Sequence, residues 1–201
     1  MTNNRSLPVR PLLTGLVLLA STCSLSAQRA EFNIIKGDNV VGRIVAMKNE
    51  AAQGTDYFMT SYAEVDVVLK QVVRTSMSAG YRNGLLQSCH STVNVNGSVR
   101  DSSRLALRDG KQLCYVHPGP AVQKDVSVAW TTARMYFEEP TDAPAIFVES
   151  VLALCPLQRT AEGRYTLTFP NKQRNHYIYK NGVLQEIQVD RPFFDLVFRR
   201  V

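Results

Sequence analysis

The stretch NGLLQSCHSTVNVNGSVRDSSRLALRDG, residues 83–110, indicates how this chain folds. It contains three dipeptides, Asn83-Gly84, Asn96-Gly97 and Asp109-Gly110, that favour two-residue type I′ turns, because Asn or Asp followed by Gly accepts positive φ at both positions. Each turn is separated from the next by 11 residues. At ~3.3 Å per residue such a segment forms a strand of about 36 Å. We therefore expect long antiparallel strands joined as a meander.

Turn and strand signals of the same kind continue on both sides of this stretch. Asn181-Gly182 is a fourth type I′ dipeptide, and Gly37-Asp38 separates two apolar runs, so each predicts a hairpin. Alternating apolar side chains, typical of half-buried strands, occur in the sets Tyr165, Leu167 and Phe169; Tyr177 and Tyr179; and Phe194, Leu196 and Phe198. Because long strands coil, the predicted fold is all-β, an antiparallel meander curled into an open or closed β-barrel.

Two segments depart from this regular pattern. The apolar residues of 62–75 fit either a helical stripe or one face of a strand, and the five valines among them favour a strand because β-branched side chains suit a pleated surface. Between residues 117 and 144 the pattern weakens, with HPGP at 117–120 followed by Pro140 and Pro144. We expect an irregular or short helical excursion there, and such excursions often carry sites.

The composition is that of one folded domain. Among 201 residues 45% are apolar and 20% are charged, which excludes disordered and coiled-coil classes. The formal net charge of +6 is spread along the chain without a basic stripe interleaved with aromatic residues, so nucleic acid is not an expected partner.

Residues 1–27 are organised like a secretory signal peptide. Arg5 and Arg10 form a positive region, residues 12–20 (LLTGLVLLA) form an apolar region, and small residues lead to an expected cleavage after Ala27. This apolar run is far shorter than the ~20 residues of a membrane-spanning helix, and no later run approaches that length. Cys23 lacks the preceding leucine of a lipobox, which argues against a lipid anchor. We expect residues 28–201 to form a single β-barrel-like domain in the periplasm of a bacterium or outside the cell.

Three cysteines remain in that domain. If both neighbouring turns form regular two-residue hairpins, Cys89 lies opposite Arg104 and Cys114 lies opposite Leu105. Two cysteines on strands separated by a third are about 10 Å apart, beyond disulfide reach. We expect buried free thiols, and a bridge from Cys155 to one of the others is the alternative.

Carboxylates are the main candidates for a polar site. Glu149 is predicted on a strand beside Phe147, and a buried carboxylate there needs a partner, which Arg134, Arg191 or the amide of Asn175 could supply. The resulting cluster is either a structural ion pair or the polar floor of a pocket. The candidate ligand-binding residues are Glu139, Glu149, Asn175, Tyr177, Tyr179 and Arg191.

Catalytic and metal-binding motifs are missing from the sequence. There is no nucleophile elbow, phosphate-binding loop or zinc motif. His90, His117 and His176 are far apart in sequence, and Cys89 cannot pair with His90 because adjacent strand residues point to opposite faces. We expect no enzyme activity, no metal and no cofactor.

Several segments resemble a family of small secreted bacterial β-proteins classed as a domain of unknown function. These segments are FNIIKGDNVVGRI (32–44), MYFEEP (135–140), IFVES (146–150), YTLTFP (165–170), NHYIYKNG (175–182) and RPFFDLVFRR (191–200). The resemblance implies an all-β fold and no assigned activity. The strand layout is also similar to the open half-barrels of lipoprotein carriers.

We therefore expect an exported non-enzymatic protein that binds a lipid or another hydrophobic ligand in a barrel cavity. Two alternatives stay open. An envelope structural or protein-interaction module would have a filled interior and an unpaired edge strand or exposed apolar patch. A hydrolase would use Glu139 or Glu149, with a raised pKa, facing a wet cleft.

Overall fold

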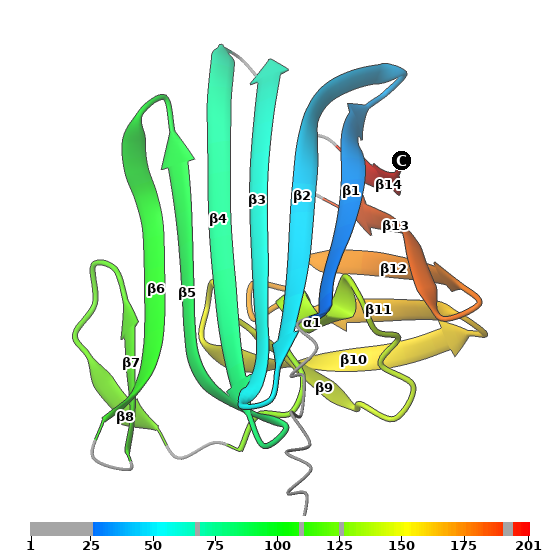
Figure 1. Cartoon of the computed structure of the whole chain (residues 1–201). Helices are drawn as coiled ribbons and strands as arrows, with labels where there is room; N and C mark the ends of the chain where they lie inside the picture. Colours follow the sequence, from blue (N-terminus) through cyan, green and yellow to red (C-terminus); the bar gives the residue numbers. More distant parts are fainter. Residues whose placement is uncertain (1–25, 67–68, 109–110, 125–126, 191–194) are drawn as a thin grey trace, which may run out of the picture.

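In the computed structural model, residues 26–66, 69–108, 111–124, 127–190 and 195–201 are described. They form a 14-stranded antiparallel sheet and one short helix, α1 (Thr132–Met135) (Figure 1). The strands are β1 (Ser26–Lys36), β2 (Asn39–Ala51), β3 (Gly54–Asp66), β4 (Lys70–Arg82), β5 (Leu85–Val95), β6 (Ser98–Arg108), β7 (Lys111–Val116), β8 (Val122–Lys124), β9 (Ala145–Val148), β10 (Ala153–Ala161), β11 (Arg164–Thr168), β12 (Arg174–Lys180), β13 (Val183–Val189) and β14 (Leu196–Arg200). The predicted export signal lies outside this part of the chain, except that Ser26 and Ala27 begin β1.

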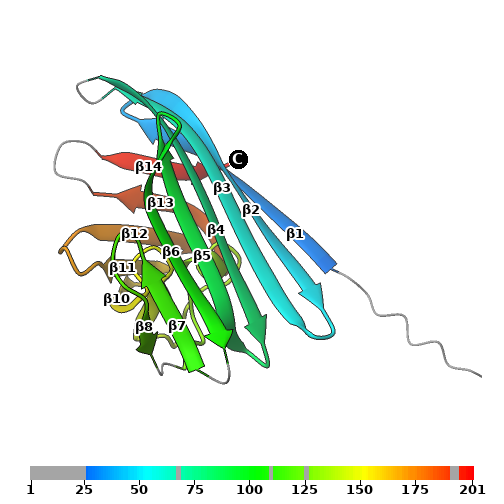
Figure 2. The ribbon, with the colours of Figure 1, turned by 90° about the vertical axis from the view of Figure 1, so that its left-hand side faces the viewer.

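Two meanders are joined through the first and last of these strands. The strands β1 to β8 follow one another in the sheet, as do β9 to β14, and β1 pairs with β14 with Phe32 opposite Arg200. The two remaining edges, β8 and β9, do not pair with each other, so the barrel is open. Figure 1 shows β9 to β12 running across the lower parts of β1 and β2, and Figure 2 shows them on the concave side of the layer that β1 to β6 form. The predicted antiparallel β-barrel-like fold is confirmed.

The predicted turns form where the sequence places them. Asn83, Asn96 and Asn181 each have φ of 53°, and the glycine after each also has positive φ. Gly37, with φ of 58°, joins β1 to β2. Asp109-Gly110 lies outside the described residues, between β6 and β7.

A β-bulge follows four of these hairpins at the same position. The register shifts by one residue at the third residue after the turn, which is Val41 in β2, Gln87 in β5, Arg100 in β6 and Gln185 in β13. An extra residue increases the local twist and bends the strand. The repeated bulge therefore helps to curl the sheet and reverses which side chains face inward beyond it.

The bulge at Arg100 corrects the predicted cysteine register. Cys89 lies opposite Leu105, not Arg104, and Cys114 lies opposite the same Leu105 from the other side. Both cysteines therefore face the concave side, whereas the regular hairpin would have put them on opposite faces. They are buried free thiols, as is Cys155, so the expectation of unpaired cysteines is confirmed.

The ambiguous segment 62–75 is divided between two strands. The strand β3 ends at Asp66 and β4 begins at Lys70, and these two residues lie opposite each other. Residues 67–68 lie outside the described residues. Leu69, expected on a strand face, directly precedes β4 and is 77% exposed. Residues 67–69 include no Gly, Asn or Pro, so the sequence did not predict a break here.

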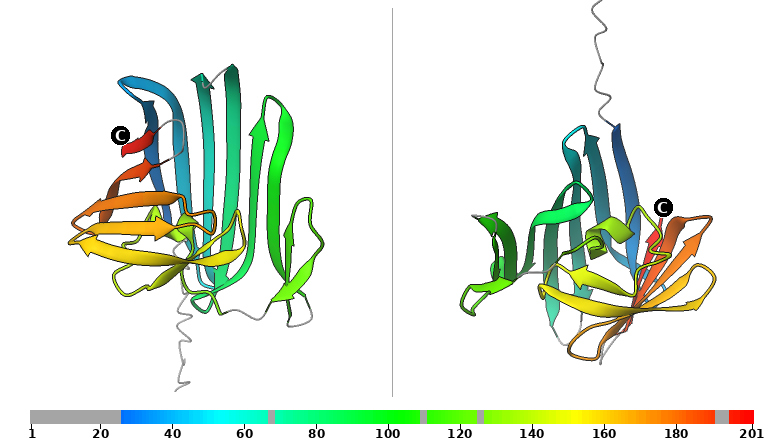
Figure 3. Two further views of the ribbon diagram at one scale, coloured as in Figure 1. Left: turned by 180° about the vertical axis from the view of Figure 1, so that it is seen from behind. Right: turned by 90° about the horizontal axis from the view of Figure 1, so that it is seen from below.

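A segment that we call the strap, residues 127–140, crosses between the two meanders and carries α1 (Figure 3). The backbone N–H of Leu86 in β5 donates to Val128, and that of Phe147 in β9 donates to Trp130. Met135 is completely buried and Tyr136 packs edge-on to Phe32 of β1, with ring centroids 5.4 Å apart. The strap thus fills the concave side of the sheet, and the predicted short helical excursion is confirmed. No helix in the described part of the chain has the length and apolar character to cross a membrane.

Candidate binding site at the mouth of the open barrel

A pocket of about 310 Å³ opens at the end of the sheet where β2 turns into β3 and β4 into β5. The strap forms its remaining wall. We call it the mouth pocket, and its lining residues are Lys48, Glu50, Gly54, Thr55, Tyr57, Tyr81, Gly84, Arg134 and Glu138.

Lys48 is the buried charge of this pocket. It follows Ile44 and Ala46 on the inward face of β2, so its stem is covered by the core and the residue is only 8% exposed. Its ammonium group lies 2.6 Å from Glu50 Oε1 and 3.0 Å from Glu138 Oε1. Burial alone would lower the pKa of Lys48, but the hydrogen bonds to these two carboxylates outweigh it and raise the pKa. Lys48 is therefore charged at neutral pH.

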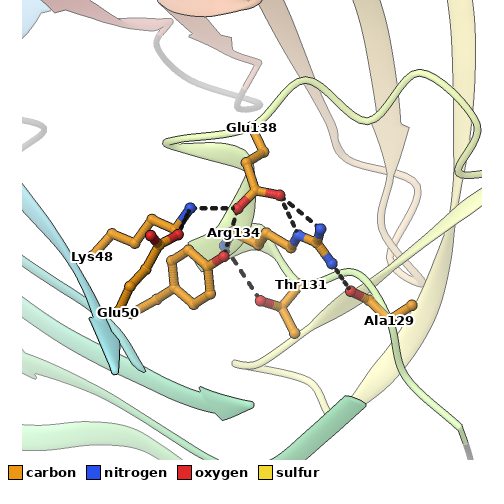
Figure 4. Close-up of polar contacts among 7 residues, drawn as sticks. Lys48, Glu50, Ala129, Thr131, Arg134 and Glu138 are labelled. Carbon is orange, nitrogen blue, oxygen red and sulfur yellow. Dashed lines mark hydrogen bonds and ion pairs between the residues drawn. The ribbon is translucent and has the colours of Figure 1, made fainter. Parts of the chain in front are cut away.

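Glu138 is the centre of the polar network (Figure 4). Besides Lys48, its carboxylate accepts hydrogen bonds from Tyr57 Oη at 2.7 Å and from Arg134 Nε and Nη2 at 2.8 and 2.7 Å. Burial would raise the pKa of Glu138, but these donors outweigh it and lower the pKa. An ionised Glu138 therefore ties β2 and β3 to the strap.

Arg134 is fixed from several sides. Its Nη1 donates to the carbonyl of Ala129 at 2.7 Å, and its guanidinium lies over the ring of Trp130, 4.1 Å from the centroid. Arg134 is the third residue of α1, whose N-cap is Thr131. The short helix turns the side chain toward Glu138, where Arg134 Nε and Nη2 both donate to the same carboxylate oxygen, Oε2, in charge-assisted hydrogen bonds.

Aromatic rings complete the walls. Tyr57 and Tyr81 pack edge-to-face with centroids 5.5 Å apart, and Phe137 tilts against Tyr57 at 6.0 Å. Burial, followed by the hydrogen bond to Glu138, raises the pKa of Tyr57, which therefore stays a neutral donor. The mouth pocket thus combines two cations, two carboxylates and apolar ring faces, a combination suited to holding a small polar molecule.

Glu149, predicted to be a strand residue, lies one position beyond the end of β9 and is completely buried. Its carboxylate accepts hydrogen bonds from the backbone N–H groups of Thr132 and Ala133, at 3.2 and 2.9 Å, and from the Thr132 hydroxyl. Of the expected partners, Arg134 is wrong, because it pairs with Glu138 and the first turn of α1 supplies donors for Glu149 instead. Burial raises the pKa of Glu149 against these hydrogen bonds. Its role is to hold α1 to the end of β9.

Two other predicted site residues, Glu139 and Tyr179, meet at a second pocket of about 480 Å³. Glu139 Oε1 accepts a hydrogen bond from Tyr165 Oη, and Tyr179 Oη donates to the carbonyl of Met135, both at 2.7 Å. Arg159 and Lys180 are also among the lining residues. Both polar groups are therefore used to anchor the strap.

The remaining predicted residues do not join a common site. Tyr177 is buried opposite Ile187, and Asn175 lies between Leu167 and Val189 in the same sheet. Arg191 lies outside the described residues. Within the described part of the chain, no group of three or more His, Cys, Asp or Glu side chains could hold a metal ion.

The sequence analysis missed Lys48, Glu50 and Tyr57. The signal for Lys48 was present, because it continues the inward alternation of Ile44 and Ala46 with a charged residue. A charge on an apolar strand face requires a partner. One partner, Glu50, lies two residues further along β2, and the other, Glu138, comes from the strap, far away in sequence.

The open antiparallel sheet, with its concave side filled by the strap, defines an all-β, barrel-like protein. The chain belongs to the family described as "Domain of unknown function (DUF6134)", whose model matches residues 32–201. Its fold is similar to a solved structure described as "Beta-barrel-like Protein of Domain of Unknown Function DUF1849 from Brucella abortus", with a TM-score of 0.55 and 14% identity over 89% of this chain and 97% of that one. At this identity the likeness shows the fold alone. No curated protein sequence matches the chain. The expected membership of an all-β family of unknown function is confirmed.

Proposed function

We propose that the protein is an exported, non-catalytic binding protein that holds a small polar ligand in the mouth pocket. The observation that carries this proposal is the position of Lys48, a buried ammonium group at a pocket of about 310 Å³. Buried charges are rare unless paired or used. Small-molecule sites typically combine apolar walls with a few fixed polar groups, and their volumes begin at about 300 Å³.

The packed interior favours a ligand at the mouth of the barrel over a ligand inside it. Phe32, Met135 and Leu167 are completely buried between the two meanders. A lipid or another hydrophobic ligand would have to displace these side chains and lose their packing. A polar ligand at the mouth requires no such change.

Binding, rather than hydrolysis, is favoured by the state of the carboxylates. A general acid needs a raised pKa and access to the substrate. Glu138 reaches the mouth pocket but has a lowered pKa, whereas Glu149 has a raised pKa but is completely buried. Each residue therefore meets only one of the two requirements.

A second candidate function, protein interaction, is favoured by one edge of the sheet. The strand β7 pairs with β6 only from Ser103 to Arg108, so residues 98–101 have no neighbouring strand on that side among the described residues. Val99, in this stretch, is 58% exposed. Such an edge can accept an added strand.

A thermal-shift screen tests the mouth-pocket proposal. The purified protein is screened against sugars, amino acids and sugar acids, together with a Thr55→Trp variant that plugs the pocket and a Thr60→Trp control on the exposed face of the same strand. We expect ligands that raise the melting temperature of the wild type and of Thr60→Trp but not of Thr55→Trp. Equal shifts in both variants, or no shift from any compound, would overturn the proposal.

A further inference from the structure

The two carboxylates that hold Lys48 are bound very unequally. Glu138 also receives hydrogen bonds from Tyr57 and Arg134, and its side chain is 28% exposed. Among the described residues, the Glu50 carboxylate forms an ion pair with Lys48 alone, and its side chain is 44% exposed. Glu138 is thus a fixed part of the wall, whereas only one contact holds Glu50 in place.

The position of Glu50 lets its side chain leave without disturbing the sheet. It lies two residues after Lys48 on the same face of β2, one residue before the strand ends at Ala51. Its backbone is paired with Ser26 on one side and Thr55 on the other. A rotation of the side chain into solvent therefore breaks the contact with Lys48 and leaves the strand pairing intact.

The charge balance of the mouth pocket determines which chemical group can replace the Glu50 carboxylate. With Glu50 bound, the two cations Lys48 and Arg134 balance the carboxylates of Glu50 and Glu138. With Glu50 turned away, Lys48 and Arg134 share the single carboxylate of Glu138, and the partly buried site carries one net positive charge. Excess charge in a partly buried site is costly, so the site favours an anion in place of the one that leaves.

We infer that the ligand of the mouth pocket is a small monocarboxylate, whose carboxylate displaces Glu50 and binds Lys48 Nζ. This inference rests on the proposed function. Glu50 acts as a tethered substitute for the ligand, and the rings of Tyr57 and Tyr81 line the space for the rest of the molecule. The volume of about 310 Å³ limits that molecule to the size of an amino acid or a single sugar acid.

The inference is tested with a Glu50→Gln variant and two matched probes, glucuronate and glucose, which share a sugar ring and differ in the carboxylate. Asp56→Asn is the control, because it removes one carboxylate nearby that is paired with Arg82 and does not line the pocket. By isothermal titration we expect Glu50→Gln to bind glucuronate about fivefold more tightly than the wild type, since the competing ion pair is gone. Asp56→Asn should bind it like the wild type, and glucose should bind no variant.

Lys48 provides a second test. Lys48→Arg should retain glucuronate binding and Lys48→Gln should lose it. If Lys48→Gln fails to fold, the glucuronate affinities of Glu50→Gln and Asp56→Asn still test the inference.

The outcomes separate the two proposals. An equal gain in Glu50→Gln and Asp56→Asn would show a general charge effect and overturn the inference. If glucose binds as tightly as glucuronate and Thr55→Trp abolishes the binding, the ligand is not specifically a monocarboxylate. The proposal of a polar ligand in the mouth pocket would then still stand. Failure of every probe and of the whole library would overturn both.

Discussion

Glu138 and Glu139 are adjacent in sequence but accept hydrogen bonds from opposite meanders. Glu138 Oε1 is bound by Tyr57 of β3 and Glu139 Oε1 by Tyr165 of β11, each at 2.7 Å. Two successive side chains at the end of the strap therefore connect the two layers of the sheet. The strap acts as a tie across an open barrel that has no pairing between β8 and β9.

Tyr57→Phe should destabilise the protein through loss of this tie. The substitution keeps the ring and removes a buried donor to an ionised carboxylate, a hydrogen bond worth about 1.5–3 kcal/mol. Urea unfolding measures the change. Tyr115→Phe is the control, because Tyr115 is an exposed tyrosine hydrogen-bonded to His117, and it should change stability by less than about 0.5 kcal/mol. Equal effects would show that Tyr57 contributes no more than a surface contact.

Glu149 should give stability an unusual pH dependence. Burial raises its pKa above the ordinary 4.5, so the folded protein binds this proton more tightly than the unfolded chain does. The corresponding stabilisation is complete below the unfolded pKa and is lost as the pH rises through the folded pKa. In urea unfolding at a series of pH values, the wild type should therefore lose stability relative to Glu149→Gln as the pH rises from about 4. A difference independent of pH would contradict this assignment.

Glu138→Gln should show the opposite trend. The pKa of Glu138 is lowered by its donors, despite burial, so its stabilisation is present above the ordinary value of 4.5 and is lost as the pH falls through the folded pKa. The advantage of the wild type over Glu138→Gln should therefore shrink on acidification. An advantage that grows toward low pH would be incompatible with the observed network.

Insertion of one residue after Arg100 should unfold or severely destabilise the protein. If the bulge keeps its size, the inserted residue puts Arg104 opposite Cys89 and turns Leu105 toward solvent. Loss of one large buried side chain typically costs about 2–5 kcal/mol. Deletion of Arg100 is the control in urea unfolding. It removes only the residue that the pairing skips, so Cys89 stays opposite Leu105, and it should cost less than the insertion. A stable insertion variant would mean that β6 can pair in either register.

The three cysteines should be unreactive in the folded protein. Burial raises the pKa of Cys89 to about 12 and also raises the pKa values of Cys114 and Cys155, so little thiolate forms at neutral pH. Alkylation mapped by mass spectrometry should label all three rapidly in urea and only slowly in buffer. Rapid labelling of Cys89 in buffer would show that β5 opens readily.

The hairpins were predictable because their cause is local. Asn83, Asn96 and Asn181 each precede a glycine, and the backbone follows the conformation that this pair favours. The bulges were not predictable, because Val41, Gln87, Arg100 and Gln185 share no chemistry. Since a one-residue shift reverses every later side chain, a correct turn still led to a wrong partner for Cys89.

Only some residues of the candidate site were predicted, because their partners come from distant parts of the sequence. The sequence identified Glu139 and Glu149 as candidate carboxylates, but what the carboxylates of this region bind depends on contacts between distant segments. Tyr57 and Glu138 are 81 residues apart, and neither segment alone indicates the other. Sequence alternation could show that Lys48 faces inward, but only the fold shows which carboxylates surround it.

The pairing of β1 with β14 places a seam between the earliest and latest described strands inside the sheet. As the chain is synthesised, the hairpins β1 to β8 can form early, while the outer side of β1 must wait for residues 196–200. Contacts of such long sequence separation slow folding and leave apolar edges exposed to other chains. The outer edge of β1 therefore stays unpaired, and open to other chains, until the last strand of the protein has been made.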